Sequence, residues 1–340
     1  MTVHPALRPV LITLAALIPL ILMSIAIPAA AQSTDKDVLQ AVVGVKTQIP
    51  QDARTASFLG REREGSGIVI DDQGLVLTIG YLILEADSAV ITGPDGKQVP
   101  ASIVAYDHES GLGLLRLSGK LAIKPMRLGS STAVNLQDKV LVASRGGDRP
   151  VIITEVVSRR VFTGGWEYLL ENAIFTSPPH RFHSGAALVG EDGRLLGVGS
   201  LFVGNAVAAN VMSQGNMFVP VDVLKPVLAD LLQTGRRGGK KRPWLGANTS
   251  EHRGRVFVDR VSPGGPAAEA GISANDLIMG VNGTPTNGQA DFYRKLWAAG
   301  EAGGTVKLNV LPEAGADFKV KEIPVTTGDR YEWLKLGRSF

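Results

Sequence analysis

Short runs of aliphatic and β-branched residues, separated by turns that carry glycine and acidic side chains, recur through residues 35–232. The runs at 65–70 and 75–78 enclose an acidic, glycine-bearing turn, which predicts a β-hairpin. The same pattern returns at 88–92, 101–104, 112–117, 139–143 and 151–157. Many short strands with regular turn signals are typical of an all-β barrel or sandwich, so we expect a mainly β architecture.

The pattern changes near the end of this region. Aliphatic side chains at helical spacing predict a helix over 221–233, and Gly235 follows as its C-terminal cap. Residues 234–242 are basic and glycine-rich, which indicates a solvated, flexible linker, with contact to an anionic surface as the alternative. Residues 243–328 mix strand-like and helix-like runs, as a small α+β module does, and 329–340 form a tail without a clear pattern.

The composition excludes several classes of function. None of the 340 residues is a cysteine, so the chain has neither a disulfide framework nor a thiolate metal site. No histidine pair or carboxylate cluster has metal-ligand spacing, and no glycine-rich turn opens a helix after a parallel strand. We therefore expect no metal, nucleotide or other cofactor. The formal net charge of +3 is too small to indicate nucleic-acid binding.

Residues 1–31 have the layout of an export signal. Arg8 is the only formally charged side chain, an apolar run follows at 10–27, and alanines at 29–31 offer a cleavage site. We expect cleavage and export to the periplasm or an equivalent compartment. The alternative is an uncleaved segment that anchors the protein to a membrane, because an apolar run of 18 residues is near the lower length limit for a span.

The turn at residues 181–188 carries the chemistry. It presents Ser184 directly before a glycine, and a strand-like apolar run follows. A serine before glycine at a tight turn between strands is how a nucleophile is presented to a carbonyl group. The serine hydroxyl is weak by itself, so it requires a base within hydrogen-bond reach and a third group that orients the base.

Further residues around this turn resemble a known family. The resemblance to HtrA/Deg-type trypsin-like serine proteases lies in the Ser184 turn and in residues 65–78, 106–115, 128–131 and 218–220. Residues 243–283 resemble the PDZ domain that follows the protease in that family.

The resemblance extends over about residues 36–328. It implies a trypsin-like domain at 36–233, built as two six-stranded β-barrels with the site between them, and a PDZ domain at 243–328 after the linker. It also implies a homotrimer formed through the N-terminal segment, in which Phe58 lies.

The catalytic triad of the family does not carry over. Tyr81 stands where the family has the histidine base, and Gly111 stands where it has the orienting aspartate. Phe182 replaces a glycine whose backbone N–H donates into the oxyanion hole, and a Cβ resists the backbone angles that glycine permits. Tyrosine, with an ordinary pKa of about 10, is a hydrogen-bond donor rather than a base at neutral pH. Because triad members act as a unit, we expect Ser184 to be vestigial.

Another histidine would have to supply the missing base. His183 adjoins the serine, but neighbouring side chains in a turn usually diverge, and His180 follows a proline pair that holds the backbone extended. The others are His4 in the leader, His108 near the expected domain interface and His252 in the PDZ segment. We expect surface or structural roles for all five. Prolines and aromatic residues at 177–182 also alter the wall of a substrate pocket.

The PDZ segment keeps its binding elements. The loop whose backbone N–H groups receive a peptide's C-terminal carboxylate is matched by Trp244, Leu245, Gly246 and Ala247. The strand after this loop accepts a peptide as an added strand. Phe292, Leu296 and Ala299 lie on one face of the second helix, where they either form core or line the groove.

Two hypotheses result. The first, which we favour, is an exported HtrA/Deg-like pseudoprotease that binds peptide segments or protein C-termini through its PDZ domain, as an adaptor, scaffold or chaperone in envelope protein quality control. The second is a serine-type endopeptidase in which Ser184 works with a nonstandard base.

Overall fold

The computed structural model describes residues 1–2, 38–313, 319–334 and 336. The expected export signal therefore falls almost wholly outside the described residues. Within the described part of the chain, no helix has the length and apolar character that a membrane crossing needs.

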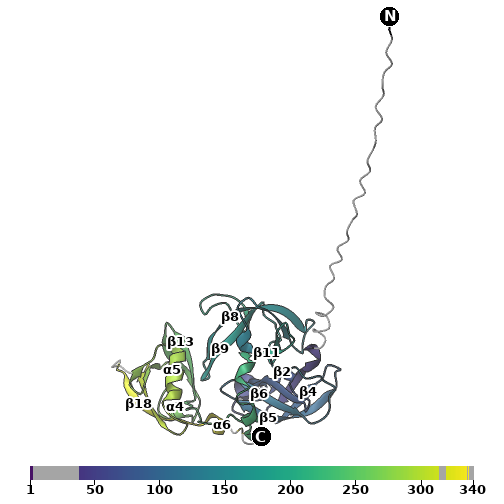
Figure 1. Ribbon diagram of the computed structural model, residues 1–340. Coiled ribbons are helices and arrows are strands. Elements are labelled where there is room, and N and C mark those ends of the chain that lie inside the picture. Colours follow the sequence, from purple (N-terminus) through teal and green to yellow (C-terminus); the bar gives the residue numbers. More distant parts are fainter. Residues whose placement is uncertain (3–37, 314–318, 335, 337–340) are drawn as a thin grey trace.

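Two closed six-stranded antiparallel barrels form the larger part of the molecule (Figure 1). The first has the strand order β1-β2-β3-β6-β5-β4. Its strands are β1 (Val42–Gln48), β2 (Glu62–Val69), β3 (Leu75–Ile79), β4 (Ser88–Thr92), β5 (Gln98–Asp107) and β6 (Leu112–Leu117). The short segments α2 (Ala56–Leu59) and η1 (Gly80–Leu82) lie in its connections. The expected hairpin is β2 and β3, in which Val69 pairs with Val76 across the acidic turn.

The second barrel has the order β10-β11-β12-β9-β8-β7. Its strands are β7 (Lys139–Ala143), β8 (Val151–Gly164), β9 (Tyr168–Ser177), β10 (Ala187–Val189), β11 (Leu195–Val203) and β12 (Gly215–Pro220), with η2 (Ser131–Ala133) before them. Aliphatic side chains of both barrels form one continuous buried cluster. The expected double barrel of mainly β structure is confirmed.

The helix expected over 221–233 is interrupted. A short η3 (Val221–Val223) is followed by turns, and α3 covers only Leu228–Thr234. Pro226 lies at the break, where it has no N–H for the helical ladder and restricts the residue before it. Gly235 caps α3 in the left-handed conformation, with φ of 74°.

The segment that is expected to be a PDZ domain forms a five-stranded antiparallel path, β13-β14-β15-β17-β18, with β16 paired to β15. Its strands are β13 (Ala247–His252), β14 (Arg255–Val261), β15 (Leu277–Val281), β16 (Thr284–Pro285), β17 (Thr305–Leu311) and β18 (Lys321–Thr326), with helices α4 (Pro266–Glu269) and α5 (Gly288–Ala298). Phe292 and Leu296 of α5 are fully buried in a second apolar cluster, separate from that of the barrels.

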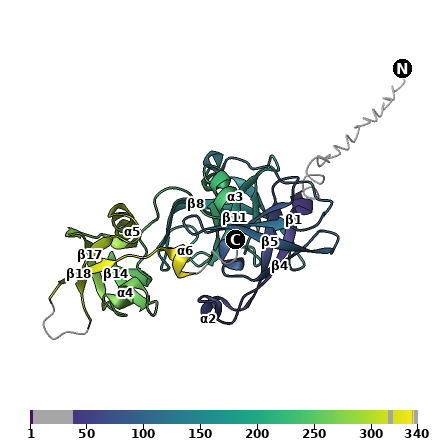
Figure 2. The ribbon, with the colours of Figure 1, turned by 90° about the horizontal axis from the view of Figure 1, so that it is seen from below.

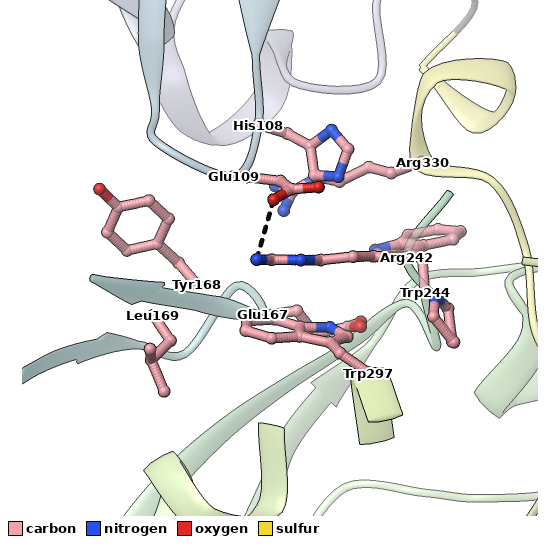
Figure 3. A pocket seen from close by; sticks show the side chains of 10 residues that line it. His108, Glu109, Glu167, Tyr168, Leu169, Arg242, Trp244, Trp297 and Arg330 are labelled. Carbon is pink, nitrogen blue, oxygen red and sulfur yellow. Dashed lines mark ion pairs between the residues drawn. The ribbon is translucent and has the colours of Figure 1, made fainter. Parts of the chain in front are cut away.

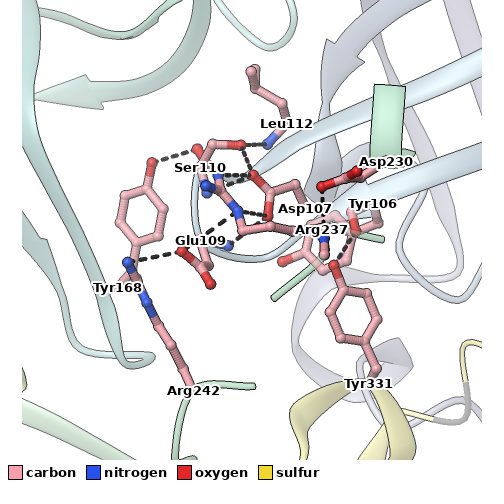
Figure 4. A network of polar contacts seen from close by, with 11 residues as sticks. Tyr106, Asp107, Glu109, Ser110, Leu112, Tyr168, Asp230, Arg237, Arg242 and Tyr331 are labelled. Atoms are coloured by element: carbon pink, nitrogen blue, oxygen red, sulfur yellow. Dashed lines mark hydrogen bonds and ion pairs between the residues drawn. The ribbon is translucent and has the colours of Figure 1, made fainter. Parts of the chain in front are cut away.

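The linker and the tail tie the two domains together. Arg237 donates to the buried Asp107 carboxylate at 2.7 Å, and Arg242 pairs with Glu109 at 2.8 Å (Figure 4). These linker cations are therefore paired with acidic groups of the barrel and not solvated as a free hinge. The tail forms α6 (Arg330–Trp333), seen beside the barrels in Figure 2, and Tyr331 hydrogen-bonds the backbone oxygen of Tyr106.

Candidate functional site: the Ser184 turn and the PDZ loop

The turn between β9 and β10 holds Ser184 in a fixed, half-buried position between the barrels. Gly185 has φ of 71°, and a Cβ built on it would lie 1.9 Å from the backbone oxygen of Ser66, so only glycine fits. The Gly185 N–H donates to Gly199 O at 2.8 Å. The backbone oxygen of Ser184 accepts from the Ser66 N–H at 2.8 Å. The chain thus keeps a rigid serine-presenting turn.

Tyr81 lies directly against this serine. It follows Gly80, whose own Cβ would lie 2.3 Å from the Tyr106 ring, so the short η1 segment packs too closely for any side chain there. Tyr81 Oη is 2.8 Å from Ser184 Oγ and 2.8 Å from the backbone oxygen of Ser200. The structure therefore brings together the serine and the residue that occupies the expected base position. Ser200 is a partner that sequence reasoning did not identify.

The Tyr81 phenol cannot serve as a general base. Burial raises the pKa of Tyr81 to about 12, so only about one molecule in 100,000 carries the phenolate at neutral pH. A phenol has one proton and the Ser200 oxygen can only accept, so both contacts are satisfied when Tyr81 donates to Ser200 and Ser184 donates to Tyr81. In that arrangement the serine proton rests on a neutral phenol oxygen, which is far too weak a base to remove it.

Gly111 provides no carboxylate at the expected orienting position. Its φ is 76°, a left-handed conformation that glycine adopts freely, and a Cβ there would be in ordinary van der Waals contact with the Tyr168 ring at 3.4 Å. The nearby acid, Asp107, is already engaged, because its carboxylate accepts from Ser110 Oγ at 2.7 Å and from Arg237 (Figure 4). The pKa of Asp107 is lowered because these hydrogen bonds and the guanidinium charge outweigh its burial.

Phe182 does not present its amide as an oxyanion donor. The Phe182 N–H donates to Nδ1 of His180 at 3.0 Å, and its ring packs against Gly146 and Gly147. His180 is buried, and its other ring nitrogen lies 2.9 Å from the backbone oxygen of Arg149. The imidazole thus binds an amide that an oxyanion hole would need. Sequence reasoning missed this role, although His180 lies only two residues before Phe182.

None of the four histidines in the described part of the chain hydrogen-bonds Ser184. His183 turns toward the backbone oxygen of Arg181, at 3.3 Å from Nδ1. His108 packs against the Tyr331 ring, and burial lowers its pKa to about 3. His252 packs on Phe257. His4 lies outside the described residues. Among the residues described, no group of three or more potential metal ligands comes together.

A cavity of about 890 Å³ lies between the barrels and the PDZ domain. Its wall includes Tyr81 and Ser200 from the serine site and Gly246 and Ala247 from the PDZ loop. The two candidate sites therefore border one shared space. The lining is largely aromatic and aliphatic and includes three arginines, which suits an extended peptide segment.

The PDZ loop at 244–247 points its backbone donors at a carboxylate. The N–H groups of Leu245, Gly246 and Ala247 donate to the side chain of Glu167, at 3.0, 2.7 and 3.1 Å. Trp244 is held differently, since its N–H donates to Gly328 O at 3.1 Å. Three converging N–H groups are a geometry that recognises carboxylates.

Glu167 is the residue that sequence reasoning missed. It lies in the turn between β8 and β9, and Figure 3 shows it in a small pocket with Arg242, Trp297 and Arg330. Burial raises the pKa of Glu167 to about 7, although the backbone donors and Arg330 act in the opposite direction. No local pattern marks this glutamate, because its partner loop lies about 80 residues later in the chain.

Two family models match the chain. Residues 65–198 match the trypsin-like peptidase domain, and residues 243–321 match the PDZ domain. Curated relatives include the serine endoprotease DegS of Haemophilus influenzae, 29% identical over 64% of this chain and 64% of its own length. The periplasmic pH-dependent serine endoprotease DegQ of Escherichia coli K12 is 28% identical over 73% of this chain and 56% of its own length. Serine protease PepD of Mycobacterium tuberculosis H37Rv is 28% identical over 82% of this chain and 64% of its own length. The chain thus matches less than two thirds of the length of these relatives.

Solved structures give the same fold. The HtrA-type protease AlgW with a decapeptide has a TM-score of 0.55 at 19% identity and covers 88% of this chain and 98% of its own. A serine endoprotease from Yersinia pestis has a TM-score of 0.53 at 21% identity, with coverage of 89% and 99%.

Proposed function

Because the chain belongs to the HtrA/Deg-type trypsin-like serine protease family with a C-terminal PDZ domain, we propose that it is a pseudoprotease. In this proposal it is exported, and its PDZ domain binds peptide segments or protein C-termini. It acts as an adaptor, scaffold or chaperone in envelope protein quality control. The observation that carries the proposal is the 2.8 Å contact between Tyr81 Oη and Ser184 Oγ, which puts a neutral phenol in the place of a base.

Two further features support the loss of hydrolysis. Gly111 provides no carboxylate to orient a base, and the Phe182 N–H is engaged by His180 at 3.0 Å. Base, orienter and oxyanion donors normally act together: loss of one oxyanion donor costs about 10²–10³-fold in rate, and loss of the orienter or the base costs about 10⁴-fold or more.

The decisive experiment compares the purified protein with its Ser184→Ala variant. We expect equal casein turnover in both and no difference in labelling by a fluorophosphonate probe, because Ser184 has no activating partner. Cleavage that depends on Ser184 would support the second hypothesis, a serine endopeptidase with a nonstandard base. The names of the curated relatives, which are serine proteases, make this control essential.

Peptide binding is proposed for the loop at 244–247 and the adjoining strand β13. The convergent N–H groups of Leu245, Gly246 and Ala247 support it, since they already hold a carboxylate. The solved AlgW structures with a decapeptide and a tripeptide support peptide recognition within the family fold.

Export to the periplasm and assembly as a trimer complete the proposal. The leader pattern at 1–31 and the periplasmic relative DegQ support export, and an uncleaved anchor remains the alternative to cleavage. Phe58, with 54% of its surface exposed, lies in the segment at which trimer formation is proposed. Sedimentation of the mature protein tests the trimer.

A further inference from the structure

The turn of the β8–β9 hairpin lies in the groove between β13 and α5 of the PDZ domain. The Thr249 N–H of β13 donates to Gly165 O at 2.9 Å, as a strand does when a peptide is added to its edge. From α5, the Tyr293 hydroxyl lies 3.0 Å from Gly164 O and 3.2 Å from Gly165 O. A Cβ on Gly165 would come within 2.6 Å of Thr249 O, so the backbones are in close contact.

The direction of this segment is that of an antiparallel added strand. Gly165 pairs with Thr249, whereas Glu167, two residues later, contacts the N–H groups that begin at Leu245, earlier in the loop. The Glu167 carboxylate accordingly sits at the end of the added segment, where a peptide's terminal carboxylate would sit. It is buried, with 5% of its surface exposed.

An aliphatic side chain accompanies the carboxylate. Leu169 of β9 is buried in the apolar cluster of the PDZ domain, with Leu245, Phe292 and Leu296, and not in that of the barrels. The hairpin thus supplies backbone carbonyls and a carboxylate to the groove, and a leucine to the apolar cluster of the same domain. These are the chemical groups that a protein C-terminus ending in an aliphatic residue would supply.

We propose that the β8–β9 turn is an intramolecular ligand of the PDZ groove, and that an external C-terminus with an aliphatic last residue binds by displacing it. This inference rests on the proposed peptide-binding function and adds its regulation: the site is closed until a competing carboxylate opens it. The proposal stands on the four backbone N–H donors to Gly165 and Glu167 and on the burial of Leu169.

Contacts around the β8–β9 turn stabilise its position in the groove but are weak enough for the turn to leave it. Arg330 of α6 donates to Trp166 O at 2.9 Å, and Arg294 of α5 forms a two-point ion pair with Glu171 of β9. The Arg294–Glu171 pair is about half exposed, so it contributes little and breaks easily.

The test uses the full mature chain and three variants. Glu167→Gln puts an amide nitrogen, which donates and cannot accept, in place of one of the two carboxyl oxygens that take the Leu245 N–H. A protonated carboxyl group still has an acceptor oxygen at that place, so the amide weakens the closed turn in a way that protonation does not. Gly165→Ala adds the methyl group that collides with Thr249 O, and its φ is not in the left-handed region, so the hairpin itself tolerates alanine. Glu171→Gln is the matched control, because it makes the same chemical change in the same hairpin but at an exposed pair.

Binding is measured by fluorescence polarisation with labelled peptides of random sequence that end in leucine, with a free or an amidated carboxyl group. Release of a mostly closed site lowers the apparent Kd by the closed-to-open ratio, so Glu167→Gln and Gly165→Ala should bind the free-acid peptides about tenfold more tightly or better. Glu171→Gln should stay within about twofold of wild type. Equal affinity of all four proteins would overturn the inference and leave peptide binding intact.

Hydrogen exchange in the absence of peptide tests the closed turn separately from the proposed peptide binding. The amide protons of Leu245, Gly246 and Ala247 should be protected in wild type and in Glu171→Gln, and should exchange faster in the other two variants. If no protein binds peptide, the proposed function fails, while this exchange pattern would still establish the closed turn. Unchanged protection would refute the closed turn whatever the binding data are.

Discussion

At the scale of single residues, the Ser184 site differs from the family's catalytic pattern at three positions, Tyr81, Gly111 and Phe182. The Tyr81 phenol lies against Ser184 at the position of the base, and the Phe182 N–H donates to His180. The replacements at Tyr81, Gly111 and Phe182 could be read from the sequence, because the Ser184 turn aligns with a known pattern. The engagement of the Phe182 amide could not, since it depends on a rotamer of His180.

Restoring the base alone should not restore proteolysis. In Tyr81→His the new imidazole would lie beside Ser184, so we expect faster fluorophosphonate labelling. Serine-dependent casein cleavage should stay absent, because the lack of an orienting carboxylate alone costs about 10⁴-fold in kcat. The double variant Tyr81→His/Ser184→Ala is the control. Robust turnover by Tyr81→His would contradict this expectation, because it would mean that neither the missing carboxylate nor the engagement of the Phe182 N–H prevents hydrolysis.

Glu167 predicts a pH dependence of peptide binding. Its pKa is about 7 in the closed turn and near the ordinary 4.5 once exposed, so the closed form binds the extra proton. A raised carboxyl pKa favours the closed form below pH 4.5, and this advantage is lost as the pH rises through 7. The apparent affinity for free-acid peptides should therefore rise about tenfold from pH 6 to pH 8.

The other titratable and charged groups that face Glu167 do not account for this rise in affinity between pH 6 and pH 8. Arg330 and Arg242 supply guanidinium groups, burial raises the pKa values of Tyr293 and Tyr168, and burial lowers the pKa of His108 to about 3. Glu109 also has a pKa raised by burial. Polarisation measurements with Glu167→Gln identify the source, because the pH dependence should disappear in that variant. A dependence that persists would assign it to Glu109 or another group.

At the scale of elements, strands and the α5 helix were predictable because their apolar periodicity is local. The helix expected over 221–233 was predicted from apolar spacing alone. Pro226 is a local signal for the break before α3, and that prediction did not take it into account. The β8–β9 turn was not predictable as a ligand, since its contacts with Thr249 and Tyr293 join segments far apart in the chain. The linker was misread for the same reason: its basic side chains find acidic partners only in the fold.

The linker should contribute measurable stability through Arg237. Its removal leaves the fully buried Asp107 without its guanidinium partner, and breaking such a pair costs about 3 kcal/mol. We expect Arg237→Ala to lower the free energy of unfolding in urea by about that amount. Lys240→Ala, in the same linker but with a side chain that is 86% exposed, should be neutral. Equal free energies of unfolding for the two variants would show that the Arg237–Asp107 pair does not stabilise the fold.

At the scale of the whole molecule, family resemblance was enough to predict two barrels followed by a PDZ domain. The mutual arrangement of these units was not, because it depends on contacts that no motif records. The C-terminal tail illustrates this. It gave no pattern in the sequence, yet Leu334 and Leu336 pack with Leu84 and Tyr106 of the first barrel, and Arg330 holds the hairpin turn.

Because Glu167 is tethered to its own protein, it competes with external carboxyl ends at an effective concentration that stays the same however dilute the protein becomes. In the proposed closed turn, this competition raises the apparent Kd for every external end by the same factor. Below that Kd, occupancy of the groove rises in proportion to the concentration of exposed chain ends, so the domain would report their abundance over a wide range without saturating.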